Sequence, residues 1–269
     1  MTKLKTPTFI PEIFEHILGD SFHEIKEWLE NGEHCYLGKD AHLENCNCEK
    51  SEDIKGFDVP VLIQNDEVKK KKLMIIVGES PLRNGTEKGL LVDFPFAVDY
   101  KNEPPQCAVY KKLFNELLKD YDLYITDIIK VWKKNEKLTV GENDRDILDE
   151  ELEILRGMYD DIHILLMGSN AKKWDIDYDN CIEIPHMSRQ NWNTWRIKIY
   201  EDVFRKLIND GKITKEDIED LLVKDTNELE FCSMKADTVA NTAFEMISSE
   251  LEKRLSNTTV TVVKTTILL

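Results

Sequence analysis

The stretch KLMIIVG, residues 72–78, decides the fold: it is a short apolar run rich in β-branched side chains, and the carboxylate of Glu79 follows it directly. Such runs are typical of strands that are buried on both faces of a parallel sheet. Loops that follow the strands of a doubly wound sheet hold most of its chemistry. Glu79 is therefore either a working acid or a polar residue that a turn tolerates.

Three later segments repeat this pattern and alternate with segments of helical spacing. DLYITDIIKV (122–131), DIHILLMGS (161–169) and CIEIPH (181–186) read as strands, whereas 109–121 and 146–158 have the apolar spacing of amphipathic helices. Strands that alternate with helices predict βαβ units and a mainly parallel sheet. The expected fold class is therefore α/β.

The two ends of the chain have a different pattern. Residues 11–31 show helical spacing, residues 32–58 look irregular, and helical segments follow residue 193, one of them over 236–255. The last residues, TTVTVVKTTILL (258–269), suit a strand at a sheet edge. The predicted domains are an N-terminal helical and irregular extension (1–60), an α/β domain (61–210), and a C-terminal helical extension with a terminal strand (211–269).

Composition limits the classes of function. The chain has 269 residues, six cysteines and a formal net charge of −16, and no 18-residue apolar stretch is found in it. We therefore expect a soluble, cytoplasmic protein with reduced cysteines and no membrane partner. The negative charge argues against a generally basic nucleic-acid-binding surface, although it permits a local positive groove.

Three loops stand at the carboxyl ends of the predicted strands: GESP (78–81), TDIIK (126–130) and IPHMSRQNW (184–192). In order and content they resemble the uracil-DNA glycosylase superfamily, particularly its short bacterial and archaeal branch. The resemblance covers roughly residues 73–195 and includes a helix and strand that end in glycine. It implies a three-layer sandwich of helices around a mainly parallel central sheet.

The resemblance also implies a reaction. Glycosylases of this superfamily extrude a base from DNA and hydrolyse its N-glycosidic bond, which leaves a cation-like sugar and an anionic base. Glu79 matches the acid that orients water and stabilises positive charge, and His186 matches the histidine that donates a hydrogen bond to the departing base. Without the resemblance, Glu79 reads as a turn residue, and His186 is equally well a ligand, a base or a surface group.

Aromatic residues in VDFPFAVDY (92–100) fall where the family places a phenylalanine that stacks on the flipped base. Phe96 is the first candidate and Phe94 the second, and the alternative is that both are core aromatics. In the third loop, the resemblance assigns DNA contacts to Met187 as an apolar wedge and to Ser188 or Arg189 as phosphate ligands. Met187 departs from the family pattern, because a proline usually follows the histidine.

Asp127 is the most informative departure, because the short branch has asparagine there. An asparagine amide can donate to O4 of uracil and accept from N3–H, whereas an ionised aspartate has no donor. A carboxylate instead suits the exocyclic amino group of a cytosine-type base, provided that Asp127 or the base carries a proton. The alternative is that Asp127 only caps its loop.

No metal or other cofactor is expected. Part of the short branch holds an iron–sulfur cluster, but here Cys46 and Cys48 are separated by a single residue, and Val131 and Asp146 stand where later cysteines would be needed. The spacing is also poor for structural zinc. The early polar segment nevertheless contains five side chains that can bind a metal, so the sequence leaves open whether a metal site lies there. They are His34, Cys35, His42, Cys46 and Cys48.

Two functional hypotheses follow. The first is a monofunctional DNA glycosylase that acts on a uracil-like or modified cytosine base, in DNA repair or in defence against viruses with modified DNA. The second is a glycosylase-like fold without catalysis that binds nucleic acid or a protein partner. The retained Glu79 and His186 favour the first hypothesis, and the net charge of −16 favours the second.

Overall fold

A five-stranded sheet forms the centre of the computed structural model, which describes residues 10, 13, 35–37, 54–65, 72–79, 90–97, 108–133, 139–176, 181–187 and 240–253. Its strands run in the order β3, β6, β4, β8 and β9. Only β3 is antiparallel to its neighbour. The expected α/β class with a mainly parallel sheet is therefore confirmed. The strands are β3 (Val61–Ile63), β4 (Lys72–Gly78), β6 (Asp122–Asp127), β8 (Asp161–Met167) and β9 (Cys181–Ile184).

The central position of β4 follows from its sequence. Six of its seven residues are buried, and the exception is Lys72 at the end where the strand begins. A strand with neighbours on both sides and helices on both faces has no polar face to present, so a continuous apolar run is what it requires. The run at 161–167, which becomes β8, has the same burial pattern.

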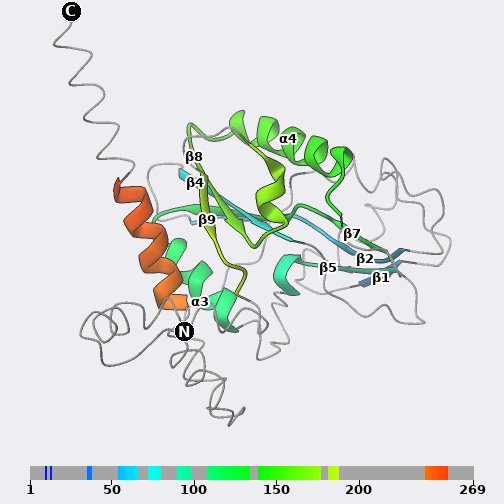
Figure 1. Cartoon of the computed structure of the whole chain (residues 1–269), viewed down its shortest axis with the longest axis horizontal. Helices are drawn as coiled ribbons and strands as arrows, with labels where there is room; N and C mark the ends of the chain where they lie inside the picture. The colour runs from blue at the N-terminus through cyan, green and yellow to red at the C-terminus, as the bar shows by residue number, and fades with distance from the viewer. Residues whose placement is uncertain are drawn as a thin grey trace, which may run out of the picture.

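The strand order contains a topological switch point. From β4 the chain crosses to β6 on one side, and from β6 it crosses back to β8 on the other side of β4. Figure 1 shows helix α4 (Glu142–Arg156) over one face of the sheet and helix α3 (Ala108–Leu117) on the opposite face. In open α/β sheets, ligands bind beyond the carboxyl ends of the strands at such a point. Here it lies between β4 and β8.

Two boundaries differ from the expectation. The predicted strand 122–131 is divided in two, because it ends at Asp127 and a separate short strand begins at Val131. The Ile128 N–H still donates to the Gly78 carbonyl of the neighbouring strand at 3.0 Å. Helix α4 begins four residues before the predicted residue 146, since its first turn is polar and carries no apolar signal. The N–H of Gly141 donates to the carboxylate of Asp144 at 2.8 Å and closes this start.

A second sheet of four strands was not predicted. It has the order β1, β5, β2 and β7, with parallel pairing only between β2 and β5. Two of its strands lie in the segment 32–58 that we expected to be irregular. The strands are β1 (Cys35–Leu37), β2 (Ile54–Asp58), β5 (Leu90–Asp93) and β7 (Val131–Lys133).

The predicted helix over 236–255 is confirmed as a helix over residues 240–253, which lies near α3 in Figure 1. Its residues Ala240, Ala243 and Ile247 are buried against the core. The helical spacing over 11–31 and the proposed terminal strand over 258–269 lie outside the described residues, apart from Ile13. Among the residues that the structure describes, no helix is long and apolar enough to cross a membrane.

Candidate active site

Four neighbouring strands deliver residues of the candidate site to one edge of the central sheet. Glu79 follows β4, Asp127 ends β6, Gly168 follows β8, and His186 lies two residues beyond β9. Because these strands are parallel, their carboxyl ends meet at the same edge. The structure therefore brings together the three residues that the sequence singled out, Glu79, Asp127 and His186.

The side chain of Glu79 is held across the switch point by the loop after β8. Its Oε1 accepts a hydrogen bond from the backbone N–H of Asn170 at 3.0 Å and one from the hydroxyl of Ser169 at 3.3 Å. Gly168 makes this approach possible: it has a φ of 99°, and a Cβ on it would lie 2.4 Å from Glu79 Oε1. The carboxylate is thus fixed by two donors while the residue stays partly exposed.

Asp127 and Phe96 pack against the backbone of Gly78. A Cβ at residue 78 would lie 2.1 Å from Asp127 Oδ1 and 2.8 Å from Phe96 Cζ, so only glycine fits there. Asp127 is buried, with 2% of its surface exposed. Phe96 is held in the left-handed region, with φ 61° and ψ 14°, which is uncommon for an aromatic residue and is found at functional sites.

His186 lies in an aromatic surround. Its ring is stacked at 22° to the ring of Phe96 with the centroids 6.0 Å apart, and the hydroxyl of Tyr110 lies 3.4 Å from each ring nitrogen. Burial lowers the pKa of His186, and the negative charge of Glu79 opposes this shift. At neutral pH the imidazole is therefore neutral, and it carries one ring N–H, which is a hydrogen-bond donor.

The other predicted site residues are less well placed. Phe94 is 1% exposed and Met187 is 2% exposed, and both belong to the hydrophobic core. This burial favours Phe96 over Phe94 as a stacking residue and does not favour an exposed wedge at Met187. Ser188 and Arg189 lie outside the described residues.

Sequence reasoning missed two parts of this site. Ser169 and Asn170 are small polar residues without a chemical signature, and the only signal was the glycine at the end of β8. Tyr110 was read as part of a helix pattern, although it points from α3 toward Phe96, with ring centroids 4.8 Å apart. Both contributions depend on contacts between segments that are distant in sequence.

A buried ion pair lies behind the β6 loop, on the α4 side of the sheet. The ammonium of Lys130 contacts Oε1 of Glu151 at 2.9 Å and donates to the carbonyl oxygen of Asp127 at 3.0 Å. The hydroxyl of Thr126 donates to Oε2 of Glu151 at 3.1 Å. Burial raises the pKa of Glu151, and the charge of Lys130 opposes this.

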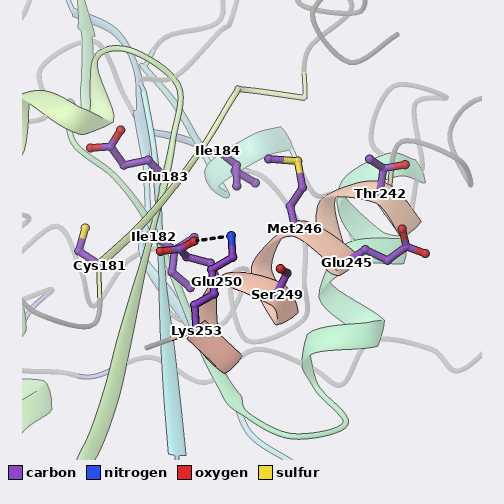
Figure 2. Close-up of a pocket in the computed structure, with 10 residues that line it drawn as sticks. All are labelled: Cys181, Ile182, Glu183, Ile184, Thr242, Glu245, Met246, Ser249, Glu250 and Lys253. Atoms are coloured by element: carbon purple, nitrogen blue, oxygen red, sulfur yellow. Dashed lines mark ion pairs between the residues drawn. The ribbon is translucent and has the colours of Figure 1, made fainter. Parts of the chain in front are cut away.

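A groove of about 620 Å³ lies elsewhere, between β9 and helix 240–253, as Figure 2 shows. Ion pairs occupy part of its charged lining: Glu250 pairs with Lys253 at 3.6 Å, and Glu183 pairs with Lys172 at 2.6 Å. None of the predicted site residues lines this groove. The lining residues are Cys181, Ile182, Glu183, Ile184, Thr242, Glu245, Met246, Ser249, Glu250 and Lys253.

Within the described part of the chain, no group of three or more His, Cys, Asp or Glu residues is arranged to hold a metal ion. Of the five histidines and cysteines in the early polar segment, only Cys35 is among the described residues, and it is the first residue of β1. His34, His42, Cys46 and Cys48 lie outside it.

Comparisons with protein-family models, with curated protein sequences and with solved structures find no match to this chain. The residues at the strand ends are therefore the part of the molecule whose chemistry indicates a function. They offer a fixed carboxylate, a neutral imidazole and a buried carboxyl group at one edge of the sheet. Such a set can orient a water molecule, stabilise positive charge and donate a hydrogen bond to a leaving group.

Proposed function

We propose that the protein is a monofunctional DNA glycosylase that hydrolyses the N-glycosidic bond of a flipped uracil-like or modified cytosine base. One observation carries this proposal: Glu79, Asp127 and His186 gather at the carboxyl edge of the sheet, and Glu79 lies at the switch point. The central sheet with helices on both faces supports a glycosylase-like sandwich as the finer description of the fold.

In this proposal, Glu79 orients the attacking water and stabilises the cation-like sugar. The bond between the sugar C1′ and the base nitrogen breaks, and the electron pair leaves with the base. The water oxygen then bonds to C1′ and loses its proton to Glu79 or to solvent. The hydrogen bonds from Asn170 N–H and the Ser169 hydroxyl hold the orientation of the Glu79 side chain.

His186 acts on the leaving group in this scheme. A neutral imidazole can donate its N–H to the anionic base without transferring a proton, and the buried position of His186 favours the neutral form. The stacked ring of Phe96 beside it supports a role in holding the planar base. Both residues lie on the α3 side of the sheet, as does the carboxyl group of Asp127.

Asp127 would read the base. With a proton on Asp127 or on the base at N3, the carboxyl group can pair with a base that carries an exocyclic amino group, whereas an ionised carboxylate opposite O4 of uracil would place two acceptors together in a buried site. Asp127 is buried at the end of β6, where this contact would be costly. We therefore place amino-bearing bases ahead of uracil as substrates.

A second candidate function is a binding module without catalysis, and the net charge of −16 favours it. Proteins that bind duplex DNA by its phosphates usually carry a positive surface. Such a module would keep the fold and release no base.

A panel of oligonucleotides distinguishes the two functions. Purified protein is incubated with single- and double-stranded oligonucleotides that carry uracil, cytosine or modified cytosines, and abasic sites are detected by alkaline cleavage. The glycosylase proposal predicts alkali-labile sites at one class of base. Alkali-labile sites at no base would support the module instead, and a gel-shift assay would then show whether the module binds DNA or leaves it unbound.

A further inference from the structure

The peptide unit between Asp127 and Ile128 is fixed at both of its polar groups. Its carbonyl oxygen accepts from the ammonium of Lys130 at 3.0 Å, and its N–H donates to the carbonyl of Gly78 at 3.0 Å. With both groups held, the plane of the peptide is restrained, and so is the backbone from which the Asp127 side chain leaves.

Lys130 is itself held from the far side of the sheet. Its side chain is 3% exposed, and Glu151, which anchors it from helix α4, has a side chain that is 4% exposed. The Thr126 hydroxyl binds the other oxygen of Glu151. A buried ammonium with two partners has little freedom to leave, because any movement would leave a charge unpaired in the core.

We propose that Lys130, anchored by Glu151, is a positioning residue that sets the Asp127 carboxyl group and thereby the choice of base. The effect on the choice of base rests on the proposed function, whereas the positioning of Asp127 by Lys130 does not. The turn at 127–130 also brings the N–H of Ile129 to the carbonyl of Glu79 at 3.3 Å, so the same turn joins the two candidate functional loops.

Paired substitutions separate positioning from stability. Lys130→Met alone or Glu151→Met alone leaves one buried charge without its partner and lowers Tm by about 10 °C. The double variant Lys130→Met/Glu151→Met removes both charges at similar volume and brings Tm back to within a few degrees of the wild type. Thr126→Val is the matched control, since it removes a donor to Glu151 and leaves Lys130 on the Asp127 carbonyl.

The first readout needs no enzymatic activity. In the double variant, the amide of Ile128 should exchange its hydrogen at least about tenfold faster than in the wild type, because the turn is no longer held. Thr126→Val should exchange at the wild-type rate at this amide. Wild-type exchange in the double variant would overturn the positioning role, whatever the protein does to DNA.

The second readout is the ratio of excision rates on amino-bearing and keto-bearing bases. The double variant should lose about tenfold in this ratio, and Thr126→Val should keep it. Faster exchange with an unchanged ratio would overturn the link to base choice. If the wild type releases no base, the proposed function fails, while the exchange experiment still decides whether Lys130 holds the turn.

If the double variant does not fold, Glu151→Gln replaces it. This variant keeps an acceptor for Lys130 without the charge, so it should accelerate hydrogen exchange at the Ile128 amide by a smaller factor.

Discussion

The carboxylate of Asp127 occupies the space in which a side chain on Gly78 would lie, with its Oδ1 2.1 Å from the Cβ position of residue 78. The two residues are register partners on the neighbouring strands β4 and β6. Glycine at the end of β4 is thus a condition for placing a carboxyl group at this edge of the sheet.

Gly78→Ala should displace both Asp127 and Phe96, because the new methyl group would lie 2.1 Å from one and 2.8 Å from the other. We expect a loss of about 1–3 kcal/mol in the free energy of unfolding, as for other overpacked sites, together with a fall in base excision. Denaturant titration and the abasic-site assay measure the two effects.

Gly141→Ala is the control for this change. A Cβ on Gly141 would meet its nearest neighbour, Asp144 Oδ2, at 3.5 Å, which is an ordinary contact. Wild-type stability and excision in Gly78→Ala would contradict the packing described around Asp127.

The buried imidazole of His186 should make stability depend on pH. Its pKa is lowered in the folded state, so between that pKa and the unfolded value of about 6.5 the unfolded chain binds more protons. The contribution of His186 to the free energy of unfolding is complete above about pH 6.5. It is lost as the pH falls from there to the folded-state pKa, by at most about 1.4 kcal/mol per pH unit. Denaturant titrations of the wild type and of His186→Asn between about pH 5 and about pH 8 measure the difference in slope. Equal slopes would show that His186 titrates normally in the folded protein.

Asp127→Asn should move base preference toward uracil. The amide can both donate to O4 and accept from N3–H, and a good bidentate contact is worth about 1–3 kcal/mol, or roughly ten- to a hundredfold in selectivity. The measurement is the ratio of uracil to cytosine-type excision in the variant and the wild type. Equal loss on every base would instead make Asp127 a general catalytic or structural group, and no change would make it a loop residue.

Under the proposed glycosylase mechanism, the protein should not form a covalent intermediate with DNA. Lys130 is the only lysine in the three strand-end motifs, and its ammonium is held by Glu151 and the Asp127 carbonyl. A Schiff base needs a free, reachable amine. Borohydride treatment during the reaction should therefore trap no protein–DNA adduct, and a trapped adduct would overturn the monofunctional mechanism.

Four of the five strands of the central sheet were predictable because their signal is local, whereas β3, with three residues, was not predicted. The apolar runs that became β4 and β8 were read to within two residues, since burial on both faces leaves no room for polar positions. The second sheet was missed because β1 has three residues and β2 contains Gly56 beside an irregular pairing. Such short strands form through partners distant in sequence, which local patterns do not report.

The candidate site was predictable in part for the same reason. Glu79, Asp127 and His186 stand at the ends of strong strands, so their common edge follows from parallel topology. The burial of Met187 and the contribution of Tyr110 depend instead on how α3 and the β9 loop pack. No local pattern distinguishes a core methionine from an exposed one.

The most direct test measures free base and abasic DNA together, for the wild type and for Glu79→Gln. Glutamine keeps an oxygen for the Asn170 and Ser169 donors but removes the charge, so the fold should stay intact while excision falls about 10²–10³-fold. Glu183→Gln, on the exposed face of β9, is the control and should excise at the wild-type rate. The account predicts one free base for each abasic site with the wild type. Release of no base from any oligonucleotide, or an unchanged rate in Glu79→Gln, would contradict it.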